Sequence, residues 1–522
     1  MVFATLAVLL PALPAWAETP GLAQLGGTFD DVRRGIEALA TSGSPRAAPV
    51  LEALQAGRLF ARPGDTPIIR TPEGQTLDAE TGNPVPNSDT GVRPIRSNNA
   101  VRRALDAALG GVRLFSPDAA TRDAAAAAVF KSRDAAALPA LDRAIAAEHD
   151  AGVLDTMREA RAAATLASAD VREPGRLAAV AILRARGDLD ARAVLASLPA
   201  GQPPAVAAAA AEAITGIDRL LQLWNLAQGA FYGLSLGSVL LLAAAGLAIT
   251  FGVMGVINMA HGEMVMIGAY TTYVVQEAIR AQAPQLFGAS LFFAIPLAFL
   301  VSGGLGVVIE RTLIRFLYGR PLETLLATFG LSLVLQQTIR TLFGSSNKDV
   351  GTPAWMSGAG KLGQLTLTYN RVAIIVFAVL VLAALMAVLR YTALGLRMRA
   401  VTQNRRMAAA MGIRTPWIDA LTFGLGSGVA GMAGVALSQI DNVSPNLGQG
   451  YIIDSFMVVV FGGVGNLWGT VLGALTLGVV NKFLEPIAGA VLGKIVVLVL
   501  LILFIQRKPR GMFPLKGRAV EP

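Results

Sequence analysis

The second half of the sequence is dominated by apolar stretches that are each about as long as a membrane is thick. From about Gln222 onward eight of them follow one another, near residues 226–252, 259–279, 288–310, 322–342, 372–389, 417–439, 452–481 and 487–506. A helix of about 20 apolar residues spans the hydrocarbon core of a bilayer. Only 15% of all residues are charged, against about 25% in soluble proteins. The sequence therefore predicts an all-α, polytopic membrane protein with about eight transmembrane helices over residues 222–517.

The basic residues are distributed unevenly along the chain. It carries 44 Lys+Arg and 35 Asp+Glu; residues 222–522 hold 21 and 10 of these, a net of +11, which leaves 23 and 25, a net of −2, for residues 1–221. An excess of Lys and Arg in the loops between apolar helices marks the cytoplasmic side. It predicts that residues 311–320, residues 390–414 and the C-terminus are cytoplasmic. A nucleic-acid surface would need clustered basic and aromatic residues on a soluble domain, so we expect no nucleic-acid partner.

The N-terminal part has a different character. Residues 1–17 end in Ala15-Trp16-Ala17 after a short apolar run, which predicts a secretory signal peptide cleaved after Ala17. A basic stretch ahead of this run is missing, so a true start further upstream and a retained anchor are the two alternatives. Residues 18–215 are rich in Ala, Arg and Asp at helical spacing, which predicts an exported, mainly helical domain, consistent with helical repeats. Within it, residues 63–99 are predicted to form a loop with one hairpin around Glu73-Gly74.

The number of predicted spans conflicts with the predicted topology. An exported N-terminal domain and a cytoplasmic C-terminus require an odd number of crossings, and eight is even. A glycine-rich break permits a re-entrant or divided helix where protein covers the freed backbone. The seventh stretch contains such a break at Gly462, Gly463, Gly465 and Asn466. A similar break near Gly252–Gly255 is the other candidate, and the sequence does not decide between them.

Three polar side chains lie close together at the start of the second span. Asn258, His261 and Glu263 stand within about two helical turns of one another in an otherwise apolar segment. Ionisable groups in a span are costly and are usually retained for a purpose. One interpretation is structural, with Asn258 capping a broken helix and Glu263 at its positive end. The other is functional, with the three groups lining a translocation path. His-Glu-x-x-His is absent, so no zinc-protease site is predicted.

The predicted cytoplasmic segment from Gly395 to Thr415 is the second candidate site. Its middle predicts a short helix that combines arginines with an apolar surface, ended by a glycine at C′. Two interpretations stay open: a helix that docks into a groove of a partner protein, and a helix that lies on anionic lipid. The candidate residues are Arg399, Arg405, Arg406, Met407, Met411 and Gly412.

Several kinds of chemistry are excluded by what the sequence lacks. The phosphate-binding pattern G-x-x-x-x-G-K-[ST] is absent, so ATP hydrolysis would need another polypeptide. There are no cysteines and only two histidines, His149 and His261, so no metal site and no cofactor are predicted. The chain is therefore not expected to be an enzyme.

Three motifs together resemble one family of proteins. INMAHGEMVMIGAY at 257–270 resembles the signature of ABC transporter permeases of the branched-chain amino acid and urea type. MAAAMGI at 407–413 is similar to the ATPase-coupling segment of that family, and FGGVGNLWGTVLGAL at 461–475 is similar to its late glycine-rich span. The resemblance covers about residues 222–517. The predicted exported extension resembles the first permease subunit of urea uptake systems.

The resemblance implies a function and partners. It implies a permease subunit that carries urea across a bacterial inner membrane, together with a second permease, two ATPase subunits, a periplasmic binding protein and surrounding lipid. A branched-chain amino acid permease is the alternative within the family. An autonomous channel or ion-coupled carrier is the alternative outside it, and such a protein would have no need of an ATPase-docking helix. In a further alternative the N-terminal helical domain is the working part and the spans only anchor it.

Overall fold

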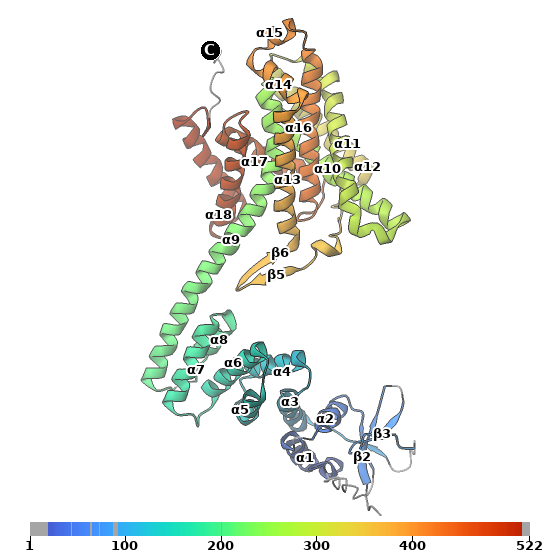
Figure 1. The fold of residues 1–522 in the computed structure, drawn as a ribbon, viewed down its shortest axis with the longest axis vertical. Coiled ribbons are helices and arrows are strands. Elements are labelled where there is room, and N and C mark those ends of the chain that lie inside the picture. Colours follow the sequence, from blue (N-terminus) through green and yellow to red (C-terminus); the bar gives the residue numbers. More distant parts are fainter. Residues whose placement is uncertain are drawn as a thin grey trace, which may run out of the picture. The chain divides into compact units, whose positions relative to one another are not determined.

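A computed structural model describes residues 19–42, 44–62, 65–72, 74–86, 92–199 and 201–513. The chain forms two compact units, Met1–Leu221 and Gln222–Pro522 (Figure 1). The predicted signal peptide over residues 1–17 lies outside the described residues.

The first unit is mostly helical. Its helices begin at residues whose side chains accept hydrogen bonds from free backbone N–H groups: Thr28 caps α1, Asp118 caps α4 and Asp150 caps α6. Its elements are η1 (Ala23–Gly26), α1 (Phe29–Thr41), α2 (Ala47–Gln55), β1 (Leu59–Arg62), β2 (Asp65–Arg70), β3 (Thr76–Asp78), β4 (Arg93–Pro94), α3 (Asn99–Arg113), α4 (Ala119–Ser132), η2 (Ala135–Ala137), α5 (Leu138–Ala147), α6 (Ala151–Ala167), α7 (Glu173–Arg186), α8 (Leu189–Ala196) and the start of α9 (Pro204–Met254).

A small antiparallel sheet lies within this unit, in the order β3-β2-β1-β4. β2 and β3 form a hairpin whose turn contains Gly74 at a φ of 84°, in agreement with the predicted turn. β1 and β4 were not expected. β1 lies before the stretch predicted to form a loop, and β4 is only two residues long, too short to show any periodicity. The first unit thus contains more β-structure than its composition suggested.

Two apolar clusters hold the first unit together. One joins η1, α1, α2, α3 and the sheet around Leu25, Ile36 and Leu51. The other joins α4 to α8 and the start of α9 around Leu141 and Met157. All five side chains are fully buried, as is typical of a protein that buries its apolar surface away from water.

The second unit is the helical bundle. It contains the rest of α9, α10 (His261–Gln282), η3 (Pro284–Ala289), α11 (Ser290–Thr312), η4 (Ile314–Phe316), α12 (Pro321–Phe343), η5 (Ala354–Met356), β5 (Ala359–Leu362), β6 (Leu365–Thr368), α13 (Tyr369–Tyr391), α14 (Ala393–Gln403), α15 (Arg405–Ala410), α16 (Thr415–Leu437), α17 (Leu447–Gly462) and α18 (Leu467–Arg507). Among the described residues, six helices are long and apolar enough to cross a membrane: α9, α11, α12, α13, α16 and α18. The predicted all-α, polytopic architecture is therefore confirmed.

The number of helical segments in the bundle is odd when two regions are each counted as two segments. The predicted seventh stretch is two helices, α17 and the first arm of α18, which meet closely at Gly462 and Gly469. α18 itself turns at Gly489, whose φ of 77° is not helical, so residues 467–488 and 490–507 form separate arms. α9, α10, α11, α12, α13, α16, α17 and the two arms of α18 then make nine segments. An odd number places the two ends of the bundle sequence at opposite ends of the bundle.

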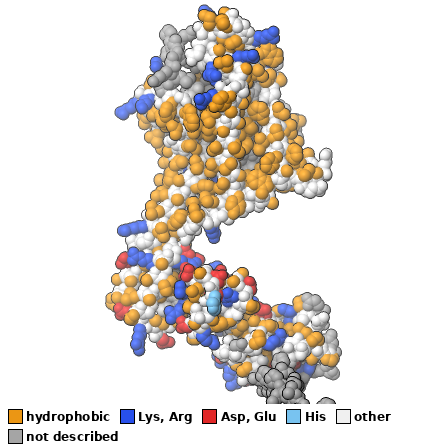
Figure 2. Space-filling view, viewed as in Figure 1, with side chains coloured by type: hydrophobic (Ala, Val, Ile, Leu, Met, Phe, Trp, Pro, Cys, Tyr) orange, Lys and Arg blue, Asp and Glu red, His pale blue; other side chains and the backbone are white. Residues whose placement is uncertain are grey.

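Figure 1 shows what each end of the bundle carries. α14 and α15 lie at one end of the second unit, and the β5–β6 hairpin lies at the other. Hydrophobic side chains cover most of the face shown for this unit in Figure 2. The apolar surface is thus directed outward, as expected of helices in contact with lipid or with other apolar helices.

α10 lies at the centre of the bundle, where helices meet at glycines. A Cβ atom at Gly268 of α10 would lie 2.0 Å from the carbonyl oxygen of Gly431 on α16. A Cβ at Gly262 would lie 2.4 Å from the carbonyl oxygen of Gly448 in α17. Small residues let helix backbones approach closely where lipid supplies no hydrophobic driving force. α10 is thereby fixed against α16 and α17 by its backbone.

Candidate functional site

The polar triplet lies where the chain passes from α9 into α10. α9 ends at Met254, Gly255 follows with a φ of 69°, and α10 begins at His261. The side-chain oxygen of Asn258 accepts a hydrogen bond from the backbone N–H of Ala260 at 3.0 Å. Asn258 therefore stabilises the turn that precedes α10, because the N-cap position itself, Ala260, has no side-chain cap.

His261 ties α10 to α9. Its Nε2 lies 2.9 Å from the carbonyl oxygen of Ala243, and the side chain is 1% exposed. A carbonyl can only accept, so Nε2 donates, and Nδ1 of the neutral ring then has a free lone pair. Nδ1 has no hydrogen-bond partner among the described residues. The described part of the chain contains no group of three His, Cys, Asp or Glu side chains that could hold a metal. The geometry gives His261 a bridging contact between helices.

Glu263 reaches from α10 to α12. Its Oε1 accepts hydrogen bonds from the hydroxyl of Ser332 at 2.8 Å and from the amide of Gln336 at 2.7 Å. Its Oε2 has no partner among the described residues, although the residue is only 1% exposed. A buried carboxyl oxygen without a donor is expensive in an apolar environment. Two of the three predicted residues therefore have unused hydrogen-bonding capacity among the described residues, His261 at Nδ1 and Glu263 at Oε2.

α12 contributes a row of polar side chains that reasoning from the sequence missed. Its buried residues are all polar and occur at a spacing of four: Thr324, Thr328, Ser332 and Gln336. The hydroxyl of Thr328 accepts from the backbone N–H of Met259 at 3.1 Å, so the row also contacts the α9–α10 turn. The signal was present as a polar residue at every fourth position of an apolar helix. We call Glu263 and Tyr270 of α10 together with these four residues of α12 the α10–α12 seam.

Tyr270 of the seam and Arg340 beyond it lie toward the C-terminal end of α12. The hydroxyl of Tyr270 has no partner among the described residues, and its ring lies 4.9 Å from that of Phe343. Arg340 stands four residues after Gln336, and its guanidinium donates to the side-chain oxygen of Asn446 at 2.5 Å. The seam and Arg340 thus supply an acceptor, hydroxyl groups and a cation along one pair of helices.

The second candidate segment is two short helices rather than one. α14 and α15 are separated at Asn404, whose side-chain oxygen accepts from the backbone N–H of Met407 at 2.9 Å. Gly412 occupies C′ with a φ of 86°. The N–H of Gly412 donates to Ala409 O and the N–H of Ile413 donates to Ala408 O, which is the Schellman arrangement. The end of α15 is therefore defined by Gly412.

The side chains of this segment fall into an exposed set and an anchoring set. Met407 and Met411 are 60% and 77% exposed, and Arg399 and Arg406 are also exposed. Ala408 of α15 is buried in the bundle. The segment presents an apolar and basic outer surface and is held from beneath.

Arg405 is the anchor of α15. Its guanidinium forms an ion pair with Asp419 in the first turns of α16. It also donates to the hydroxyl of Tyr318 at 2.7 Å and lies 4.0 Å over the same ring. Tyr318 belongs to the α11–α12 connection. Arg405 therefore ties α15 to α16 and to that connection, so it is not part of the exposed surface.

The glycine-rich break lies under the C-terminal tail. Gly463 and Gly465 have φ values of 104° and 78°, and the side-chain oxygen of Asn466 accepts from the N–H groups of Trp468 and Gly469, which caps α18. The backbone N–H of Phe513 donates to the carbonyl oxygen of Gly462 at 3.1 Å. The tail thus satisfies backbone groups that the break leaves without helical partners.

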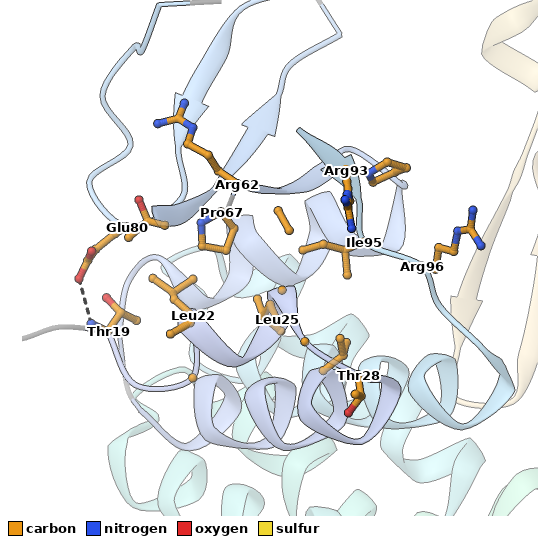
Figure 3. A pocket seen from close by; sticks show the side chains of 18 of the residues that line it. Thr19, Leu22, Leu25, Thr28, Arg62, Pro67, Glu80, Arg93, Ile95 and Arg96 are labelled. Carbon is orange, nitrogen blue, oxygen red and sulfur yellow. Dashed lines mark hydrogen bonds between the residues drawn. The ribbon is translucent and has the colours of Figure 1, made fainter. Parts of the chain in front are cut away.

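A hollow in the first unit is lined by none of the predicted site residues. It has a volume of about 1610 Å³ and lies between the segment leading into α1 and the sheet (Figure 3). Leu22 and Leu25 line one side, Arg62 and Arg93 the other, and the N–H of Thr19 donates to Glu80 at 3.2 Å. The mixture of apolar, basic and acidic groups does not single out one ligand.

Comparison with known proteins identifies relatives of the second unit. The family model described as branched-chain amino acid transport system, permease component, matches residues 229–505. The high-affinity branched-chain amino acid transport system permease protein LivH of Salmonella typhimurium is 30% identical over 292 residues, which are 55% of this chain and 94% of that protein. The permease protein BraD of the corresponding system in Pseudomonas aeruginosa is 30% identical over 296 residues, 56% of this chain and 96% of that protein.

A match that covers less of the chain is named for a different transported substance. The autoinducer 2 import system permease protein LsrC of Salmonella paratyphi B is 30% identical over 191 residues, 35% of this chain and 52% of that protein. No solved structure gives a significant match to this chain. The family model ends where the bundle ends and leaves the first unit uncovered.

Proposed function

Because the chain belongs to the family of branched-chain amino acid transport permeases, we propose that it is the permease subunit of an ABC importer for branched-chain amino acids. The importer would work across a bacterial inner membrane on ATP hydrolysed by separate subunits. The observation that carries this proposal is the exposed methionine surface of α15, set on a helix that Arg405 clamps to α16. An exposed helix surface of this kind suits a groove in a partner protein.

The proposed orientation follows from the nine segments and the basic loops. Arg311, Arg315 and Arg320, the arginines around α14 and α15, and Arg507, Lys508 and Arg510 belong to the connections that alternation places at one end of the bundle. We assign that end to the cytoplasm by the positive-inside rule. The first unit is then exported, and the β5–β6 hairpin faces the same side as that unit's point of entry into the bundle.

The coupling mechanism uses contacts between neighbouring helices. Closure of the ATPase pair displaces α15, and the pairing of Arg405 with Asp419 passes the displacement to α16. α16 contacts α10 through backbone at Gly268 and Gly431, so α10 moves with it. α12 is held by the α10–α12 seam, and a shift of α10 against α12 opens a polar route between them.

The choice of substrate rests on the relatives. The exported extension favoured urea, but the relatives that cover the bundle are named for branched-chain amino acids, and neither these two nor the autoinducer permease is named for urea. Branched-chain amino acids therefore fit better than urea. The first unit, on which the urea expectation rested, is outside the matched region.

The proposed partners are a second permease, two ATPase subunits and a periplasmic binding protein. The outer faces of α11, α12 and α13 are broadly apolar and exposed, which suits lipid or a second permease. An apolar hollow of about 450 Å³ between α11, α13 and α16 adds to this surface. An autonomous channel would have no use for the anchored methionine surface of α15.

A double substitution at α15 tests the proposal. Met407→Asp with Met411→Asp introduces charge into the docking surface, and both side chains are exposed, so folding is retained. We expect co-purification of the ATPase subunits to fall at least about tenfold, as for the central residues of an interface. Leu362→Asp is the matched control, since Leu362 is 64% exposed at the other end of the bundle. Undiminished co-purification of the double variant would contradict the docking role.

A further inference from the structure

The α10–α12 seam contains a carboxyl oxygen with unused hydrogen-bonding capacity. Both donors that reach Glu263, from Ser332 and Gln336, bind Oε1, and Oε2 has none among the described residues. The hydroxyl of Tyr270, seven residues along the same face of α10, is also buried without a partner in the described part of the chain. Two purely structural groups in an apolar interior would be expected to satisfy each other or the backbone. Their unused capacity points to a ligand.

α12 is buried along only a narrow stripe, which is the side that forms the seam. The buried residues of α12 are the four polar ones of the seam, and its remaining side chains are exposed or half-buried. α16, in contrast, buries nearly all of its length against α10 and α11. α12 is therefore attached to the bundle through this polar stripe and through the half-buried apolar side chains Leu331, Leu335, Ile339 and Phe343 beside it. A small displacement of α12 exposes Glu263 to a solute, whereas the same displacement of α16 would separate glycine-packed backbones.

The chemistry of the seam suits a solute with N–H groups. A carboxylate oxygen accepts hydrogen bonds from an ammonium or an amide. One helical turn beyond Gln336, Arg340 offers a guanidinium, which pairs well with a carboxylate. A zwitterionic amino acid carries both an ammonium and a carboxylate, whereas urea carries N–H groups and no carboxylate.

We propose that Glu263 contacts the transported solute. Its free Oε2 accepts N–H groups of the solute when α12 moves away from α10, and Arg340 pairs with the carboxylate of an amino acid in the same position. Ser332 and Gln336 orient the carboxyl group through Oε1. This inference rests on the proposed function and assigns residues to a route along the α10–α12 seam.

The test uses the complete transporter in proteoliposomes, with labelled leucine and labelled urea as the two solutes. Glu263→Gln keeps an oxygen for Ser332 and Gln336 but removes the carboxylate. We expect leucine uptake to fall at least about tenfold at low concentration, the cost of a hydrogen bond to a charged group. The melting temperature is expected to stay at the wild-type value. Asp454→Asn is the control, because Asp454 is a buried carboxylate that pairs with Lys494 elsewhere in the bundle.

A second variant separates the two solute classes. Arg340→Gln is expected to lower leucine uptake and to leave any urea uptake unchanged. If leucine uptake by Glu263→Gln equalled that of the wild type, or fell only in proportion to the loss of folded protein, the inference would be overturned. If the wild type carried neither solute, the proposed function itself would fail and the inference with it. Equal uptake of leucine by Arg340→Gln and the wild type would remove the pairing with the carboxylate.

Discussion

Each of the two units of this chain is stabilised by a different kind of interaction. The first unit has an apolar interior, and ion pairs of arginines join one helix to the next. Arg122 at α4 pairs with Glu148 after α5 at 2.6 Å, and Arg192 on α8 pairs with Asp218 on α9 at 2.5 Å. The second unit has an apolar surface, and its interior contains glycine contacts and polar side chains such as Glu263.

The two units therefore differ in the interaction that contributes most to their stability. Burial of apolar side chains stabilises the first unit because water surrounds it. Between helices in lipid that force is weak, and close backbone packing and hydrogen bonds take over. The contrast also separates rigid from movable contacts in the bundle. The α10–α16 contact is formed by backbone, whereas the α10–α12 seam is formed by polar side chains that a solute can replace.

The largest effect is expected at the α10–α16 contact. Gly268→Leu places a side chain where even a Cβ would lie 2.0 Å from a carbonyl oxygen, so the helices must separate. Overpacking commonly costs about 1–3 kcal/mol and more where backbone is in the way, so we expect a cost of more than about 3 kcal/mol and no folded protein after purification. Size-exclusion chromatography in detergent measures this.

The control for this prediction is a glycine of α12. A Cβ atom added at Gly330 would meet no neighbouring atom within 4 Å, so Gly330→Ala is expected to be neutral or to stabilise the helix by about 0.5–1 kcal/mol. A well-folded Gly268→Leu protein would show that α10 and α16 do not depend on backbone contact.

The next effect tests the interior of the first unit. Leu141 is fully buried, and Leu141→Ala is expected to cost about 2–5 kcal/mol through lost burial and the remaining cavity. Hydrogen exchange of α4 to α6 in the full chain measures the loss. Leu189→Ala, at a side chain that is 67% exposed, should leave exchange unchanged. Equal effects of the two variants would show that this unit does not rely on an apolar core.

A smaller effect is expected at the α10–α12 seam. Gln336→Leu removes one of the two donors to Glu263 and is expected to cost about 1.5–3 kcal/mol, the range for hydrogen bonds to charged groups. The thermal unfolding of the purified chain measures this cost. Gln337→Leu, at the exposed neighbouring position, is the control. A Gln336→Leu protein as stable as the control would mean that α12 is held by something other than the seam.

The smallest effect concerns the ion pair between Arg122 and Glu148 in the first unit. Hydrogen bonds from Arg122 lower the pKa of Glu148 to about 2, from 4.5. A lowered carboxyl pKa stabilises the fold above pH 4.5, and the contribution is lost as the pH falls from 4.5 toward 2. Glu148→Gln should therefore speed hydrogen exchange in α4 and α5 at about pH 7 by at most about fivefold, and the difference should shrink below pH 4.5. A difference that grew on acidification would contradict this sign.

The architecture could be predicted because the length and apolarity of a helix are properties of its own residues. The first six spans could be found from their own residues, and the turn that ends α15 followed from the single glycine Gly412. What escaped prediction depends on contacts between distant segments. The polar row of α12 indicates a site only when it is seen next to Glu263, which lies 69 positions before Ser332 in the sequence. Arg405 was predicted to belong to the exposed docking helix, and only the fold shows that it pairs with Asp419.

One other feature escaped for the same reason. The segment ending at Phe513 covers the break at Gly462 through backbone bonds that leave no trace in composition. The turn at Gly489, in contrast, lies close to the predicted boundary between the stretches 452–481 and 487–506. The roles of Asn258, His261 and Glu263 in transport stay predictions, although the structure shows which helices each one joins.

The most direct test of the account is leucine uptake by proteoliposomes in which this chain is assembled with its ATPase subunits, second permease and loaded binding protein. The account predicts uptake that requires ATP and that stops when the methionines of α15 are replaced by aspartates. Rapid movement of solute through vesicles that contain this chain alone, without ATP, would contradict it.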